Sequence, residues 1–143
     1  MADVDLIGAL IAYLSAQYEV SDLVSARVYG QELPAAQSTS MPRKALVLRY
    51  AGQGSSSGCE NTFVRHGSVR LDVWHYGETF SQADRLRRTV HAILKQVGSK
   101  VQGNCLIHSL SDLAGPIPVL DPETGWPFIV DTYSVFFAEQ PVS

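Results

Sequence analysis

The chain has 143 residues, of which 45% are hydrophobic and 17% charged, and its formal net charge at pH 7 is −3. This length predicts a single domain, residues 1–143, that can bury a core without disulfides or a metal ion. The acidic balance argues against a dedicated nucleic-acid binder, which usually carries a basic excess. Cys59 and Cys105 lie far apart in no metal-ligand spacing, which favours a reduced intracellular chain over the alternative of a disulfide between them.

The first half of the chain predicts one helix and two strands joined by long loops. Asp3 is the expected N-cap of a helix that ends near residue 17 or 18, and Ser21 and Asp22 are candidates to start a second, shorter turn. The apolar run in this helix lacks a basic leader and is too short to cross a bilayer, so we expect a protein made and used in the cytoplasm. Strands are predicted at residues 26–30 and 45–50.

Two loops interrupt this half. Residues 30–44 contain two prolines and no periodicity, and a loop of this length is usually functional or mobile. Residues 51–61, rich in glycine and serine, predict a flexible tip. The tip contains "GQGSSSG" but lacks the GK[ST] ending of a phosphate-binding loop, and no helix follows it.

A long strand and a strong helix follow. Residues 62–76 alternate, with Val69, Leu71 and Val73 on one face, and the small residues at 67 and 68 suggest a bulge. After Gly77, helical spacing places a buried face on Ala83, Leu86, Val90, Ile93, Leu94 and Val97.

The ends of this helix carry their own signals. Thr79 with Gln82 and Ser81 with Asp84 offer two capping-box registers, and Gly98 is the expected C-cap. We also expect an ion pair between Asp84 and Arg88 at i, i+4.

The last third predicts two strands joined by a proline-rich arm. Strands are expected at 104–113 and 128–137, and the second would expose Asp131 only if the sheet has a wet face. The four prolines of residues 114–127 exclude a central strand and favour an extended hairpin arm. The fold class is therefore α+β, with a mixed, mainly antiparallel sheet, two main helices packed on one face, and long loops or an extended hairpin arm.

No catalytic, metal-binding or cofactor-binding constellation is predicted. His75, beside Asp72 and Glu78, is the best candidate for a general base, but strand alternation puts Asp72 and His75 on opposite faces. We therefore expect His75 to be a surface or interface histidine. The other three histidines, His66, His91 and His108, fit no metal-ligand pattern. The arginines Arg85, Arg87 and Arg88 indicate either a solvated helix face or a contact with an acidic or phosphate-bearing neighbour.

The stretch "VRLDVWHYGETFSQADRLRRTVHAIL", residues 69–94, resembles the strand-turn-helix signature of the bacteriophage tail-completion, or tail terminator, family of long non-contractile tails. The resemblance rests on the "DVW" segment and on Ala83, Asp84 and Leu86 at the helix start. The closing strand "FIVDTYSVFF" and the N-terminal helix extend it over nearly the whole chain. The glycine-serine tip and the proline-rich arm are local variations on the pattern.

This resemblance implies a non-enzymatic virion protein, assembled in the host cytoplasm, that forms a six-membered ring. The ring would cap the head-proximal end of the tail tube and stop its polymerisation. Its implied partners are its own copies, the tube protein and the head-completion protein, while DNA passes through without specific binding and no membrane is involved. No cofactor is expected.

Two sets of residues are candidates for these contacts. We expect Arg85, Arg88, His75 and Glu78 at a subunit or tube interface, and Gln53, Gly54, Ser55, Ser56 and Ser57 in a loop that lines the lumen or touches the tube. Two alternatives stay open: a head–tail stopper or other connector ring, and a small cytoplasmic enzyme whose site brings together distant residues such as His75 and Asp131.

Overall fold

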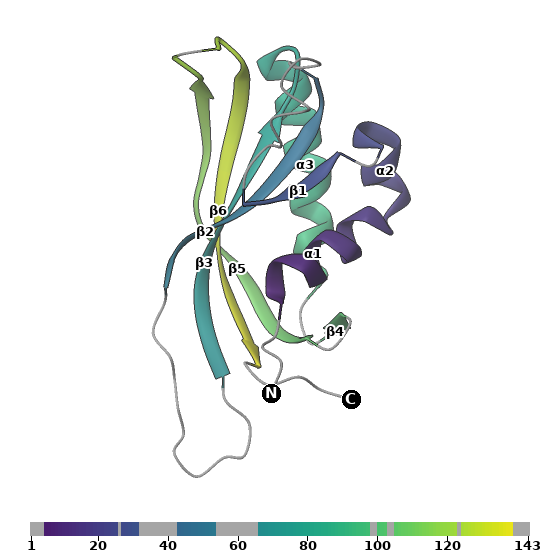
Figure 1. Cartoon of the computed structure of the whole chain (residues 1–143), viewed down its shortest axis with the longest axis vertical. Helices are drawn as coiled ribbons and strands as arrows, with labels where there is room; N and C mark the ends of the chain where they lie inside the picture. The colour runs from purple at the N-terminus through teal and green to yellow at the C-terminus, as the bar shows by residue number, and fades with distance from the viewer. Residues whose placement is uncertain are drawn as a thin grey trace.

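The computed structural model describes residues 5–25, 27–31, 43–53, 66–97, 100–102, 105–122 and 124–138. They form one six-stranded sheet with helices on one side (Figure 1). The helices are α1 (Leu6–Ser15), α2 (Tyr18–Val24) and α3 (Phe80–Leu94). The strands are β1 (Val28–Gly30), β2 (Ala45–Gln53), β3 (His66–Tyr76), β4 (Lys100–Gln102), β5 (Cys105–Leu120) and β6 (Pro127–Ala138).

The strand order is β1-β2-β3-β6-β5-β4. Only β1 and β2 pair in parallel, and every other pair in this sheet is antiparallel. The predicted α+β class with a mixed, mainly antiparallel sheet is confirmed, and α2 joins the two main helices as a third.

Local capping decides where the helices begin. The α1 N-cap is Asp5, whose Oδ1 accepts from the Gly8 amide at 2.9 Å, so the expected cap at Asp3 is wrong. The helix α2 starts at Tyr18, earlier than Ser21 or Asp22. Of the two capping boxes predicted for α3, the structure forms the one with Thr79 as N-cap.

Two side-chain hydrogen bonds cap the N-terminus of α3 in a pattern close to a reciprocal capping box. Thr79 Oγ1 accepts from the Gln82 amide at 3.2 Å, while Gln82 Oε1 accepts from the Glu78 amide at 3.1 Å. The helix ends at Leu94 with Lys95 as its C-cap. Gly98, the expected C-cap, lies outside the described residues.

The strands follow the predicted alternation except at their irregularities. β3 pairs with β6 from His66 to Tyr76 without a register shift, so the bulge expected at residues 67 and 68 is wrong. The irregularity of this part of the sheet lies in β2, between Tyr50 and Gly52. The proline-rich segment is an outer strand, as predicted, because among the described residues β4 pairs only with Cys105–Ile107 of β5. Beyond it β5 and β6 form the hairpin arm.

Hydrophobic clusters lie on both faces of the sheet. The larger one fills the space between sheet and helices and includes most of the predicted rows of α3 and β3, together with the buried side chains of α1. On the opposite face, Ala45, Val47, Tyr76 and Phe128 are buried, and Trp74 stacks on Phe128 with 4.8 Å between ring centroids. None of the described helices is long and apolar enough to cross a bilayer.

Candidate functional site

His75 lies in the interior, between β3 and α3. Its side chain is 0% exposed, and Nδ1 donates to the Ile129 carbonyl at 2.9 Å, so the proton sits on Nδ1. Burial lowers the pKa of His75 to about 4, against a smaller opposing effect of the Ile129 hydrogen bond, and the ring is neutral at pH 7. Within the described part of the chain, Nε2 has no hydrogen-bond partner.

The expectation of a surface or interface histidine is therefore wrong. His75 shares its strand face with Leu71 and Val73, and that face is the one covered by α3. Asp72 lies on the opposite face, as strand alternation predicts, where its Oδ1 accepts from the Thr132 hydroxyl at 2.6 Å. These two side chains do not form a catalytic pair.

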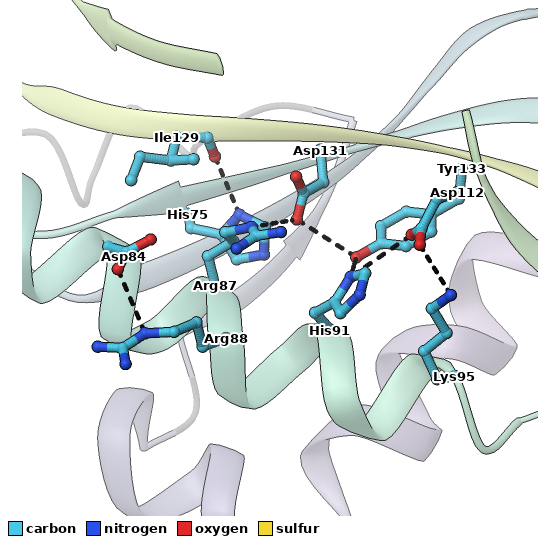
Figure 2. Close-up of polar contacts among 10 residues, drawn as sticks. All are labelled: His75, Asp84, Arg87, Arg88, His91, Lys95, Asp112, Ile129, Asp131 and Tyr133. Carbon is cyan, nitrogen blue, oxygen red and sulfur yellow. Dashed lines mark hydrogen bonds and ion pairs between the residues drawn. The ribbon is translucent and has the colours of Figure 1, made fainter. Parts of the chain in front are cut away.

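A buried ion pair joins α3 to β6 (Figure 2). Arg87 Nε donates to Asp131 Oδ2 at 3.0 Å, and the two side chains are 18% and 5% exposed. Asp131 thus lies on the helix-covered face of the sheet and not on a wet face. Arg87 was grouped with Arg85 and Arg88 by sequence. In the structure Arg87 differs from them, because it borders the apolar row of α3 and contacts the sheet.

The polar contacts continue along α3 toward β5. The Tyr133 hydroxyl donates to Asp131 Oδ2 at 3.4 Å, and His91 Nδ1 lies 3.1 Å from the Tyr133 oxygen and 3.5 Å from Asp112 Oδ1. Because the Tyr133 hydroxyl donates to Asp131 and the Asp112 carboxylate can only accept, a proton on His91 Nδ1 satisfies both contacts. One turn further, Lys95 Nζ lies 2.8 Å from Asp112 Oδ2.

Burial raises the pKa of Tyr133, and the charges of Asp131 and Asp112 raise it further. The phenol therefore stays protonated and keeps its role as a donor.

The contacts of Arg87, His91 and Lys95 recur at every fourth residue along α3 and connect it to β5 and β6 (Figure 2). We call these three contacts the α3 brace.

The α3 brace borders a pocket of about 200 Å³, lined by Arg87, His91, Asp112, Leu113, Ala114, Gly115 and Asp131. Gly115 has φ +111°, and a Cβ there would lie 2.5 Å from Asp131 Oδ1, so the close approach of β5 to β6 requires glycine. The pocket carboxylates already face Arg87 and Lys95, which is the arrangement of a structural brace. Among the described residues, no three His, Cys, Asp or Glu side chains gather in a metal-binding group.

The enzyme alternative requires His75 and Asp131 to converge. Both point toward α3 (Figure 2). However, Asp131 already binds Arg87 and Tyr133, and His75 is closed off from solvent.

The other predicted contact residues divide into two groups. Glu78, just before the N-cap of α3, and Arg85 and Arg88 on α3 are exposed, and Arg88 forms the predicted ion pair with Asp84 at 3.2 Å. Gln53 ends β2, where it pairs with Val69, while Gly54, Ser55, Ser56 and Ser57 lie outside the described residues. Their roles in contacts stay predictions.

Comparisons with known proteins give a structural likeness. No family model matches the sequence, and no curated protein is similar to it. The fold is similar to a chain of a solved structure described as "Virion of native gene transfer agent (GTA) particle", with a TM-score of 0.69 and 14% sequence identity. The likeness covers 93% of this chain and 94% of that chain. The two chains share a fold.

The remaining predicted positions carry no site. Cys105 is a buried thiol, and burial raises its pKa to about 11, with a smaller contribution from Asp5. Cys59 lies outside the described residues. His108 faces Phe136 at 5.0 Å between ring centroids, and His66 begins β3. For Arg87 the contact with an acidic neighbour, one of the two predicted alternatives, is confirmed, because it binds Asp131. Sequence reasoning missed Tyr133, whose partners Asp131 and His91 lie on β6 and α3.

Proposed function

We propose that this chain is a structural virion protein of a phage-like particle, and specifically a tail terminator. Six copies would form a ring on the head-proximal end of the tail tube, stop tube polymerisation and offer a joining surface to the head-completion protein. The observation that carries this proposal is the fold likeness to a chain of the gene transfer agent virion, at a TM-score of 0.69 over 93% of this chain. The resemblance of residues 69–94 to the tail terminator family supports the finer assignment.

The polar contacts and the exposed charges of this fold suit a subunit with a structural role. Polar contacts tie α3 to β5 and β6, while Arg85 and Arg88 stay exposed on the same helix and Glu78 is exposed just before it. Contacts between two different surfaces of neighbouring copies generate a ring when their rotation closes. Each copy brings a formal charge of −3, so the ring as a whole would let DNA pass without gripping it.

Electron microscopy of the purified protein tests the proposal directly. We expect rings with six-fold symmetry, either in solution or on the tips of purified tail tubes. A particle that is strictly dimeric and never forms rings on tubes would contradict it.

Removal of the chain from the particle that carries it separates terminator from stopper. Loss of a terminator leaves tubes of uncontrolled length, because nothing halts polymerisation. Loss of a stopper leaves tubes of normal length that do not join heads. Tubes of normal length would therefore move the proposal to the head–tail stopper position.

A further inference from the structure

The two faces of the sheet carry different charges. The helices lie on one side of the sheet (Figure 1), and we call the side opposite to them the open face. The six strands contain two arginines, Arg49 and Arg70, and strand alternation places both on the open face. Of the three strand acids, Asp112 and Asp131 bind side chains of α3, and only Asp72 lies on the open face. Arginines therefore outnumber acids on the strands of this face, although the chain as a whole is acidic.

Local contacts hold two of these three charged groups. The Arg49 guanidinium lies 4.7 Å from the centre of the Trp74 ring, and Asp72 Oδ1 accepts from the Thr132 hydroxyl at 2.6 Å. Arg70 is exposed, and no ion pair joins it to another residue in the described part of the chain. Arg70 is thus the charge of the open face that is available to a partner from outside.

Hydroxyl groups surround Arg70 on this face. The register pairs Arg70 with Ser134 on β6 and Ser134 with Ser111 on β5, so these three side chains form one row across three strands. Neighbouring strands lie about 4.8 Å apart, which spreads the row over about 10 Å. Arg70 and Ser111 are exposed and Ser134 is half-buried, while Ser68 Oγ lies 3.3 Å from Ser134 Oγ. We call Arg70, Ser134 and Ser111 the Arg70 row.

A hollow adjoins the Arg70 row. It has a volume of about 460 Å³ and is lined by Ala51, Arg70, Asp72, Leu113, Ala114 and Thr132. Three of these side chains are short, which leaves room beside the Arg70 guanidinium for a group as large as a phosphate.

The chemistry of this surface favours a phosphate-bearing partner over a protein. Arginine and the hydroxyls of serine and threonine are groups that contact DNA phosphates without reading the base sequence. The core of a protein interface is usually apolar and rich in aromatic side chains. On the open face, Tyr76 and Phe128 are only 5% and 6% exposed and lie away from the Arg70 row. The accessible part of the face therefore offers hydrogen-bond donors and one positive charge.

We infer that the open face, through Arg70, Ser134 and Ser111, contacts the phosphates of duplex DNA. One free arginine in each copy makes a weak contact that does not depend on sequence, which is compatible with DNA moving past the surface. The inference rests on the proposed function only for where this DNA comes from, namely the genome that passes through the ring.

Fluorescence anisotropy of a labelled duplex, titrated with the full chain at a series of salt concentrations from about 20 mM upwards, tests the contact. The variant is Arg70→Gln, and the matched control is Arg85→Gln, which removes the same charge from an exposed position on α3. At the lowest salt we expect Arg70→Gln to weaken binding about tenfold and to reduce the slope of log affinity against log salt by about 1. The control should stay within about twofold of the wild type, and two duplexes of unrelated sequence should give the same result. Circular dichroism confirms that both variants are folded.

A second measurement places the contact in the particle. A photo-crosslinking amino acid in place of Ser111 should form adducts with DNA in filled particles. The same amino acid in place of Ala92, which is exposed on α3, should form none.

Three outcomes overturn the inference: a wild type that binds neither duplex at about 20 mM salt, an equal loss of affinity in Arg70→Gln and Arg85→Gln, or adducts of residue 111 with protein in place of DNA. If six-fold rings still form on tail tubes in any of these cases, the proposed function stands without the DNA contact. Binding of DNA that depends on Arg70, by a chain that never forms rings, would retain the contact and remove the proposed function.

Discussion

Acid should destabilise this fold through His75. The unfolded chain takes up a proton on this side chain below pH 6.5, whereas the folded chain, with a pKa of about 4, does so only well below that. The stability that depends on neutral His75 is therefore fully present above pH 6.5 and is lost as the pH falls toward about 4. At 1.36 kcal/mol per pKa unit, the difference corresponds to about 3 kcal/mol.

The substitution His75→Gln isolates this contribution, since glutamine keeps a donor for the Ile129 carbonyl and does not titrate. Urea unfolding followed by the fluorescence of Trp74 and Trp126, at constant protein concentration, gives the free energy of unfolding at each pH. Between pH 6.5 and about 4, we expect the wild type to lose about 3 kcal/mol more than the variant. Equal pH slopes for the two proteins would refute the reasoning, because His75 would then titrate as an accessible histidine does.

Three further predictions concern the α3 brace, the tip and the channel. Asp131→Ala should lower the free energy of unfolding by about 3 kcal/mol, because it leaves Arg87 partly buried and unpaired, whereas Asp84→Ala, which breaks an exposed pair, should cost less than about 1 kcal/mol in the same urea titration. Deletion of residues 53–57 should spare the fold by circular dichroism, as loop tips tolerate change, but alter tail length or head joining in particles; normal particles would show that the tip is dispensable. In filter binding at physiological salt the isolated protein should not retain duplex DNA, and tight, salt-sensitive binding would contradict the proposed passive channel.

Elements with a strong local pattern were predictable from the sequence. The apolar row of α3, the alternation of β3, the closing strand and the proline-rich arm all follow from spacing within a few residues. The sheet order was not predicted, because the pairing of β6 with β3 joins segments far apart in the chain. Position in the sheet depends on which faces meet, and periodicity carries no information about that.

The burial of His75 and the partner of Arg87 were both missed, for different reasons. The burial of His75 could have been predicted from the sequence. Strand alternation places this residue on the same face as Leu71 and Val73, so it shares their buried environment. The partner of Arg87 could not be predicted from the sequence, because Asp131 lies 44 residues further along the chain and no local spacing connects the two residues. An arginine beside an apolar helical row is compatible with a solvated position until the strand opposite it is known.

The placement of charge in the α3 brace suggests why polar contacts stand where apolar packing would be simpler. Replacing a buried ion pair by apolar residues is often neutral or stabilising, so stability alone does not explain Arg87 and Asp131. Hydrogen bonds are directional, however, and contacts at residues 87, 91 and 95 fix how α3 lies along β5 and β6. The same helix carries the exposed Arg85 and Arg88, and the same strands form the hairpin arm. The brace therefore holds the exposed part of α3 in one orientation relative to the hairpin arm, which a subunit that joins its neighbours in a ring of fixed size requires.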